Sequence, residues 1–383
     1  MNLPEPVPAA GETPGFREQA RVWLEEALSG EFAAARGLGG PGREHEGHEL
    51  RLAWERHLGK HGWTCLGWPE RYGGRAAPLA DQVAFYEEYA RADAPARVGL
   101  IGEGLVGPTI LEFGTEEQKS RFLPPIQRGE ELWCQGYSEP EAGSDLANVQ
   151  TRASLEDGEW VVHGQKVWTS LAHVADWCFV LCRTDPDERR HRGLSYLLVP
   201  MRRPGVVVRP IVQLTGTSEF NEVFFDGART AAGNLLGAPG DGWRVAMATL
   251  GYERGASTLG QQIGFRRELA KVIETAKRTG AADDPVLRDR LVQSWLELEI
   301  MRLNALRLRG PEASIAKLYW SEWHRRLGEL AQAVQGRAGL VEEAGQLNEL
   351  QRLYLFSRAD TIYAGSSEIQ RNIIAERTLG LPR

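Results

Sequence analysis

An acid and a base stand side by side in the segment GYERGAS, where Glu253 precedes Arg254. A carboxylate of this kind can take a proton from a substrate if a fold holds it in place. The apolar residues upstream, at helical spacing, are Trp243, Ala246, Met247 and Leu250. In a helix, Arg254 lies within the stripe that they form and Glu253 lies on its edge. Charges that face inward need partners or a purpose, so these two are either catalytic or a structural pair.

Two other stretches are rich in groups that bind polar ligands. GYSEPEAGSD at 136–145 packs hydroxyl residues, glycines and a proline into ten residues. Hydroxyls and exposed backbone N–H groups in such a loop can hold a phosphate or the polar edge of a ring, although a turn-rich linker has the same composition. GQKVWTS at 164–170 ends a predicted strand with an aromatic face, Trp168, beside a hydroxyl, Ser170. The alternative for Trp168 is ordinary core packing.

Several other motifs do not predict a site. The histidines and acids of 45–49 lie in a Gly-flanked loop without the helical spacing of a zinc site, and His57 and His61 have that spacing but no carboxylate beside them. We therefore predict surface histidines and no metal. The two G-x-G-x-x-G strings that start at Gly37 and Gly102 follow no clear strand, so we interpret both as Gly-rich turns.

Three segments that differ in the spacing of their apolar residues must position these side chains. Residues 1–130 have apolar residues at helical spacing, and Thr115 with Gln118 forms a capping-box pattern. Residues 131–240 contain short β-branched and apolar runs around turns such as Asp157-Gly158, which predicts a β domain. Residues 241–383 return to helical periods. The sequence thus predicts an α+β, multi-domain chain. The helices expected in the first segment are Phe16 to Phe32, 48–61, 79–91 and 115–128.

Composition narrows the functional classes. The chain has 383 residues, 42% of them hydrophobic and 25% charged, with a net charge of −7 and no basic cluster, so nucleic acid is not expected as a partner. Its four cysteines form neither a disulfide framework nor a C-x-x-C site, which favours a reducing cytoplasm. No apolar run approaches the roughly 18 residues of a membrane span, so we expect no targeting segment and no membrane insertion.

Three separated motifs together resemble those of the acyl-CoA dehydrogenase family. GYSEPEAGSD, GQKVWTSLAHVADW and IYAGSSEIQRNIIAERTLGLP are similar, in the same order and at similar distances, to that family's T-E-P-x-A-G-S-D, G-x-K-x-W-I-T-N and I-Y-E-G-T-S-E-I-Q-R motifs. The resemblance covers nearly the whole chain. It implies an N-terminal helical domain, a middle β-barrel domain and a C-terminal four-helix bundle that bind FAD, usually in a tetramer.

The resemblance also assigns cofactor contacts. Ser138 and Ser170 would hydrogen-bond the flavin ring, Trp168 would lie against it, and Ser144 would reach the pyrophosphate. Arg278 resembles an arginine that contacts FAD of a neighbouring subunit, although the segment RTGAADDPV lacks the Gln-Phe-Gly of the family motif. The full set of implied FAD-binding residues is Ser138, Ser144, Trp168, Ser170, Arg278, Ser366 and Glu368.

The base differs from the family's commonest pattern. The reaction removes an α-proton beside a thioester carbonyl while a hydride leaves the β-carbon for flavin N5, so it needs a carboxylate and donors to the carbonyl oxygen. Where most members have Glu in I-Y-E-G-T, this chain has Ala364, of which only the backbone N–H could polarise the carbonyl. A subgroup similar to isovaleryl-CoA dehydrogenase carries the base after the β domain, ahead of an arginine. This resemblance implies Glu253 as base, with Leu250, Arg254 and Ala364 near the substrate.

Substrate and partners follow from the same resemblance. Ala364 and the small residues 255–257 leave room for a branched or bulky acyl group, and similar Y-E-R-G members act on long-chain or steroid side-chain CoA thioesters, some as two unlike subunits. We expect an enzyme that forms a trans-2-enoyl-CoA and passes electrons to an electron-transfer flavoprotein, as a homo- or hetero-tetramer. The alternatives are a non-catalytic or half-site subunit of a heteromeric dehydrogenase, and an oxidase that uses oxygen as acceptor.

Overall fold

The computed structural model describes residues 11–188, 190–253, 257–305 and 313–382. The chain gathers into two compact units that do not follow sequence order. The sheet unit consists of Ala27–Leu79 and Ala94–Glu253, and the helical unit consists of Met1–Glu26, Ala80–Asp93 and Arg254–Arg383. Each is described below by itself.

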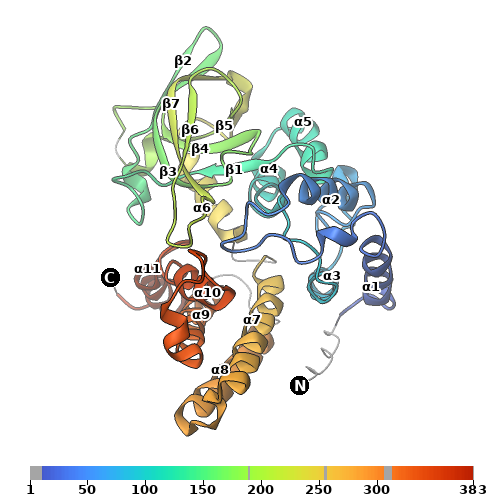
Figure 1. Ribbon diagram of the computed structural model, residues 1–383. Helices are drawn as coiled ribbons and strands as arrows, with labels where there is room; N and C mark the ends of the chain where they lie inside the picture. Colours follow the sequence, from blue (N-terminus) through green and yellow to red (C-terminus); the bar gives the residue numbers. More distant parts are fainter. Residues whose placement is uncertain (1–10, 189, 254–256, 306–312, 383) are drawn as a thin grey trace. The chain divides into compact units, whose positions relative to one another are not determined.

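Within the described residues, eight strands form the sheet of the sheet unit, in the order β6-β7-β3-β2-β4-β5-β8 with β1 beside β4 (Figure 1). β1 runs parallel to β4, whereas β3 and β7 form a long antiparallel pair. The β domain expected from the sequence is therefore present as a mixed sheet. The strands are β1 (Trp133–Gly136), β2 (Arg152–Glu156), β3 (Glu159–Ser170), β4 (Trp177–Arg183), β5 (Leu194–Pro200), β6 (Val206–Pro210), β7 (Phe220–Ala231) and β8 (Leu235–Leu236).

The turn between β2 and β3 confirms the expected Asp157-Gly158 hairpin. Glu156 and Glu159 are paired, and the two residues between them have φ of 51° and 83°. Positive φ at both central positions is the requirement of a type I′ turn, for which Asp-Gly is well suited.

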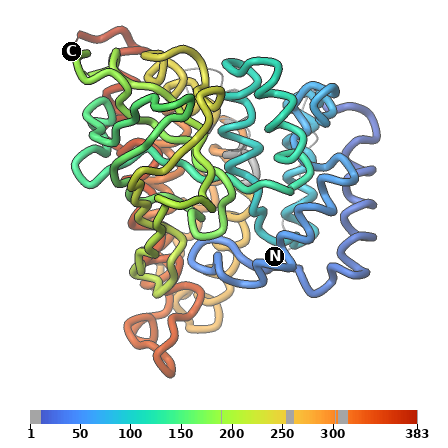
Figure 2. Tube along the Cα trace, turned by 90° about the horizontal axis from the view of Figure 1, so that it is seen from above, coloured from blue at the N-terminus to red at the C-terminus, as the bar shows by residue number. Residues whose placement is uncertain are grey.

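The centre of the sheet is buried on both faces. Phe179 and Leu181 of β4 belong to an apolar cluster shared with the helices, while Cys178 and Val180 belong to a second cluster within the strands. This explains why β4 reads as a continuous apolar run, since a strand covered on both sides needs no polar face. In both views the cyan helices α4 and α5 lie against one flank of the green strands (Figure 1, Figure 2).

The helices of the sheet unit begin and end largely where the sequence predicts. The capping box of α5 is present, with Thr115 Oγ1 accepting from Gln118 N at 3.2 Å and Gln118 Oε1 accepting from Thr115 N at 2.9 Å. The second G-x-G-x-x-G string forms a π-helical turn, η3 (Gly102–Val106), that leads into α4 and was not predicted. The helices are α2 (His48–Lys60), α4 (Gly107–Phe113), α5 (Glu116–Gln127) and α6 (Gly242–Glu253).

The helical unit is built on a core of its own. Phe265, Leu269 and Trp323 are among the buried residues at which its long helices meet. The predicted helix from Phe16 ends earlier than expected, at Ala27, and the closing helix passes into a second π-helical turn, η10 (Ile374–Thr378). The helices are α1 (Phe16–Ala27), α3 (Leu79–Arg91), α7 (Ser257–Thr279), α8 (Pro285–Ala305), α9 (Ala313–Gln335), α10 (Glu349–Ser357) and α11 (Ser367–Ile373).

Among the described residues, no helix is long and apolar enough to cross a membrane. Nor do three or more His, Cys, Asp or Glu side chains gather in that part of the chain as a metal site would require.

Candidate active site

An exposed indole lies at the end of β3. The pairing of β3 with β7 shifts register between Lys166 and Thr169, and Trp168 within this bulge has a φ of +60°. Trp168 is 58% exposed, and its ring makes an edge contact with Phe220 at 6.2 Å between ring centroids. A positive φ is rare for a bulky residue, and such outliers cluster at functional sites. Core packing is therefore wrong as the explanation of Trp168, which presents a free aromatic face.

The two predicted flavin-ring serines lie beside this indole. Val167 N donates to Ser138 O at 2.9 Å, which joins the loop after β1 to the bulge of β3. Ser170 pairs with Phe220 two residues after Trp168, and both serines are half-buried. The structure thus brings the backbones of Ser138, Trp168 and Ser170 together at the carboxyl end of β3, at one edge of the sheet unit.

A buried ion pair lies behind this edge. Lys166 is fully buried, and its Nζ donates to Glu139 Oε1 at 2.8 Å, to Tyr137 O at 3.1 Å and to Leu181 O at 2.7 Å. The same carboxylate accepts from the backbone N–H groups of Gln150 and Thr151, at 2.5 and 2.9 Å. Glu139 and Lys166 thereby tie both ends of the loop 137–151 to β3.

The charges of this pair depend on one another. Burial lowers the pKa of Lys166, although Glu139 opposes the shift. Burial alone would raise the pKa of Glu139, but Lys166 and the N–H of Gln150 bring it below its usual value. Sequence analysis missed both residues. The signal was present, since a lysine inside an apolar strand needs a buried partner.

The loop held by this pair also carries Ser144. Ser144 is exposed, and a Cβ added at its neighbour Gly143 would meet nothing within 4 Å. An open backbone and a free-facing hydroxyl are what a phosphate group requires for close approach. The exposed indole, the flanking serines and this open loop fit an aromatic cofactor that carries phosphates.

The last turn of α6 is fixed within the sheet unit. Thr249 Oγ1 lies 2.9 Å from Thr109 Oγ1 of α4 and 3.3 Å from the hydroxyl of Tyr196 on β5. Tyr252 OH donates to Glu112, also on α4. These three contacts leave little freedom for the residues at the end of α6.

The buried face of α6 corrects one expectation. Leu250, with Trp243 and Met247, is half-buried at the rim, whereas the fully buried positions are Val245, Ala246 and Thr249. The buried face is turned by about one residue from the predicted stripe. Position 253 follows Thr249 by four residues and Ala246 by seven, so helical spacing alone would continue that face to it. The side chain of Glu253 and the whole of Arg254 lie outside the described residues.

The remaining predicted residues belong to the helical unit. Ala364 and Gly365 both have positive φ, of 52° and 87°, and Gln370 Nε2 donates to the carbonyl oxygen of Ala364 at 3.0 Å. Ser366 caps α11, its hydroxyl accepting from Ile369 N at 3.4 Å. These bonds give the segment 361–366 a defined backbone path.

Glu368 and Arg278 are exposed at helix ends. Glu368 lies in the first turn of α11, where its own backbone N–H and the Ser366 hydroxyl lower the pKa of its carboxyl. Arg278 lies in the last turn of α7, where a cation is favoured by the helix dipole. The structure places neither residue with Ser138, Trp168 and Ser170 within one unit.

Three family models match consecutive parts of the chain. They are the acyl-CoA dehydrogenase N-terminal domain over residues 12–130, the middle domain over 134–228 and the C-terminal domain over 240–379. Acyl-CoA dehydrogenase IpdE1 of Mycobacterium tuberculosis is 62% identical over 375 residues, covering 96% of this chain and 97% of that protein. IpdE1 of Mycolicibacterium smegmatis is likewise 62% identical, over 97% of this chain and 98% of its own length.

Solved structures are similar over almost the whole chain. The Tcur3481-Tcur3483 steroid ACAD superposes with a TM-score of 0.83 at 30% identity, covering 97% of this chain and 99% of that chain. The ChsE4-ChsE5 complex from Mycobacterium tuberculosis superposes with a TM-score of 0.82 at 30% identity, covering 98% and 99%.

Proposed function

The chain belongs to the acyl-CoA dehydrogenase family, whose members are FAD-binding oxidoreductases, and from this premise we propose that Glu253 is the base of its reaction. The proposed reaction is the α,β-dehydrogenation of an acyl-CoA thioester to a trans-2-enoyl-CoA. The observation that supports the assignment is the buried face of Ala246 and Thr249 on α6, which helical spacing would continue to position 253. A base held at the end of a fixed helix meets the positional requirement of proton abstraction.

Each proposed residue has one task in the reaction. Glu253 accepts the proton from the substrate α-carbon, and FAD, when bound, supplies the acceptor for the hydride that leaves the β-carbon. Ala364 cannot take a proton, but its backbone N–H donates to the thioester carbonyl oxygen and so stabilises the charge that develops there. Leu250 and Arg254 contribute to the substrate side of the site.

The proposed FAD contacts begin with the residues at the end of β3 and in the loop after β1. Trp168 supports the isoalloxazine face, Ser138 and Ser170 hydrogen-bond its polar edge, and Ser144 binds the pyrophosphate. The exposed indole at the bulge supports this part of the proposal, because the protein leaves a large aromatic surface uncovered there. Arg278, Ser366 and Glu368 complete the set as FAD contacts, Arg278 towards a neighbouring subunit.

The proposed substrate carries a branched or ring-bearing acyl group. Alanine at 364 occupies less volume than the glutamate that is common in the family, and a Cβ added at Gly251 would meet nothing within 4 Å. One of the similar solved structures is described as a steroid ACAD, which agrees with a bulky substrate. An electron-transfer flavoprotein is the proposed acceptor, and the cytoplasm, where buried free thiols such as Cys178 persist, is the proposed location.

A second candidate is a subunit of a heteromeric dehydrogenase. Two of the similar structures are named as pairs of chains, Tcur3481-Tcur3483 and ChsE4-ChsE5, and the usual base position of this chain holds Ala364. In this version the chain assembles with an unlike partner into a hetero-tetramer, and it contributes either half of the site or no catalysis.

One experiment separates these candidates. The visible spectrum of the chain, purified alone and kept anaerobic, is recorded before and after addition of straight, branched, long and ring-bearing acyl-CoAs. A self-sufficient dehydrogenase shows a flavin band that branched or ring-bearing thioesters bleach. A chain without a flavin band contradicts it and favours the partner-subunit function. Hydrogen peroxide formed on admission of air at the rate of substrate turnover would instead indicate an oxidase.

A further inference from the structure

A buried charge cluster lies inside the helical unit, at the foot of the segment 361–366. His324 of α9 lies between two carboxylates, with Nδ1 2.5 Å from Asp360 Oδ2 and Nε2 2.8 Å from Glu268 Oε2. The side chains of His324 and Asp360 are 4% and 1% exposed, while Glu268 of α7 is 31% exposed. None of the residues discussed above as FAD or substrate contacts belongs to this cluster.

Asp360 connects the cluster to the segment that follows it. Its other carboxylate oxygen accepts from Tyr363 OH at 2.6 Å, and its carbonyl oxygen accepts from Lys317 Nζ at 2.6 Å. The far end of the segment is closed by Ser367 N, which donates to Thr361 O at 2.9 Å. Asp360 therefore fixes both the start of the segment and the tyrosine directly before Ala364.

The segment needs such support because of its backbone. Ala364 has a φ of 52°, which is disfavoured for a residue with a Cβ, and the neighbouring Gly365 also has a positive φ. A residue held in this region persists only when its surroundings determine it. The hydrogen bond from Gln370 holds the carbonyl of Ala364, and the Asp360 contacts hold the residues before it.

His324 carries a positive charge at neutral pH. Burial alone would lower its pKa, but the carboxylates of Glu268 and Asp360 raise it to about 10. Lys317 is the other cation close to Asp360, and it also lies over the ring of Tyr363. The imidazolium and Lys317 together balance the two carboxylates, and removing the charge of His324 leaves Asp360 buried with less compensation.

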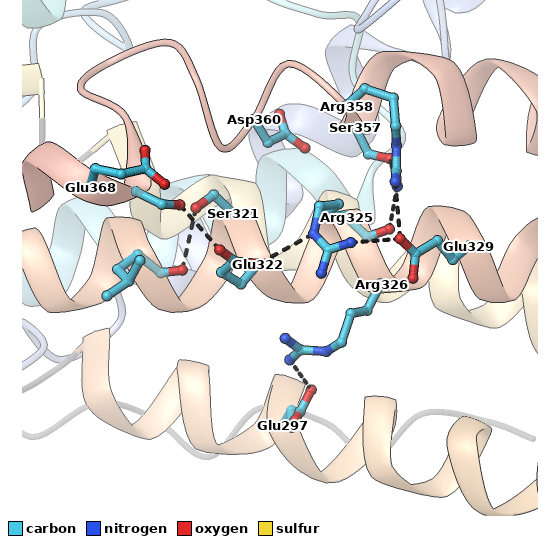
Figure 3. Close-up of polar contacts among 12 residues, drawn as sticks. Glu297, Ser321, Glu322, Arg325, Arg326, Glu329, Ser357, Arg358, Asp360 and Glu368 are labelled. Atoms are coloured by element: carbon cyan, nitrogen blue, oxygen red, sulfur yellow. Dashed lines mark hydrogen bonds and ion pairs between the residues drawn. The ribbon is translucent and has the colours of Figure 1, made fainter. Parts of the chain in front are cut away.

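Other ion pairs of the same helix have a different character. Figure 3 shows Arg326 reaching across to Glu297 of α8, and Arg325 and Arg358 meeting at Glu329. These side chains are partly exposed. The contact of Arg325 with Glu329 lies within α9, whereas Arg326 and Arg358 connect α9 to its neighbours. They supply a comparison within the same bundle, because their charges do not contact the segment 361–366.

We propose that His324 is a positioning residue, which holds Asp360 and through it the segment 361–366 in the conformation that the reaction requires. This inference rests on the proposed function, because it assumes that the backbone N–H of Ala364 donates to the thioester carbonyl. A small displacement of such a donor lowers the reaction rate more than it weakens substrate binding.

The test uses His324→Gln in the FAD-loaded protein, with Arg326→Gln as the matched control on the same helix. We expect amide hydrogen exchange in residues 361–371 to become about tenfold faster in His324→Gln and to stay unchanged in the control. Flavin reduction at saturating acyl-CoA should fall about 100-fold, while the half-saturating concentration and the FAD content stay within about twofold. Asp360→Asn should give the same result, and adding it to His324→Gln should cause little further loss.

The outcomes separate this inference from the proposed function. Unchanged amide exchange in residues 361–371 of His324→Gln would overturn the positioning role. Flavin reduction that is slowed equally in His324→Gln and Arg326→Gln would also overturn it. Purely additive effects of His324→Gln and Asp360→Asn would do the same. If no acyl-CoA reduces the flavin of the parent protein, the proposed function fails, and the exchange comparison still decides whether His324 holds the segment.

Discussion

At the scale of single residues, the most informative feature is an aromatic side chain that the fold leaves uncovered. Trp168 lies in a bulge with positive φ, beside Ser138 and Ser170. Proteins rarely expose a large indole in a strained backbone without a ligand to cover it. We therefore predict that Trp168 contributes to cofactor binding and little to the stability of the sheet.

Replacing this indole tests that division of roles. Trp168→Ala should weaken FAD binding about tenfold through lost stacking, while the unfolding midpoint of the apoprotein changes little. Fluorescence titration of apoprotein with FAD measures the first quantity and thermal unfolding the second. Trp295→Ala, at a 38% exposed tryptophan of α8, is the control and should keep parental FAD affinity. An unaltered FAD affinity in Trp168→Ala would contradict the proposed stacking.

Ala364 offers a second test at this scale, concerning substrate size. Ala364→Glu adds volume beside the proposed acyl group, so reduction by branched or ring-bearing acyl-CoAs should slow by about tenfold or more relative to straight short chains. Ala364→Gly is the matched control, since glycine accepts the positive φ and adds no volume. Stopped-flow flavin reduction with both classes gives the ratio. An equal effect on both classes would show that residue 364 does not limit acyl size.

At the scale of elements, the loop 137–151 is held to β3 by one buried ion pair. Removing one charge leaves the other without compensation, so Lys166→Met should lower the free energy of unfolding by about 3–5 kcal/mol. The double change Lys166→Met with Glu139→Gln should cost less than this, because no buried charge is left unpaired. Urea unfolding measures both.

An exposed pair supplies the comparison for that measurement. Arg229→Gln removes the partly exposed contact between Arg229 and Glu159 and should cost less than about 1 kcal/mol. If Lys166→Met lowered the free energy of unfolding as little as Arg229→Gln, the Lys166–Glu139 pair would not be what holds the loop 137–151 to β3.

The helical unit should show a pH dependence that originates in His324. Its pKa rises from 6.5 to about 10 on folding, so the folded state binds the proton more tightly than the unfolded chain. The stabilisation is complete below pH 6.5 and is lost as the pH rises through about 10. The stability difference between parent and His324→Gln should therefore shrink steadily over this interval, as urea unfolding at successive pH values would measure. A difference independent of pH would contradict the charged cluster.

Elements also differ in how far the sequence predicts them. The Asp157-Gly158 hairpin and the capping box of Thr115 and Gln118 were predicted correctly, because each is specified by residues that are neighbours in the chain. The π-helical turn η3 was missed, since its glycines are equally compatible with an open loop. The buried face of α6 was misjudged by about one residue, because Trp243 and Met247 are apolar but lie at the rim.

Site residues that meet only in the folded chain were likewise harder to predict from the sequence than those that lie in local motifs. Ser138, Trp168 and Ser170 were proposed as site residues from motifs, whereas Lys166, Glu139 and His324 were not singled out. His324 and Asp360 are 36 residues apart in sequence, and no local pattern specifies that they meet. A lone histidine on an apolar helix face, between Trp323 and Leu327, was the available signal.

At the scale of the whole molecule, the two compact units divide the proposed chemistry. The sheet unit contains Trp168 and ends with Glu253. The helical unit contains Ala364, His324 and Asp360. The family assignment rests on matches that span both units. The proposed reaction depends most directly on Glu253, the residue at which the sheet unit ends.

Glu253→Gln is the most direct test of that account. With saturating acyl-CoA under anaerobic conditions, flavin reduction should be at least about 100-fold slower than in the parent protein, while the FAD content stays the same. Glu70→Gln, an exposed glutamate of the sheet unit, should reduce at the parental rate. Parental reduction rates in Glu253→Gln with full FAD would contradict the central claim, and another group would then have to take the α-proton.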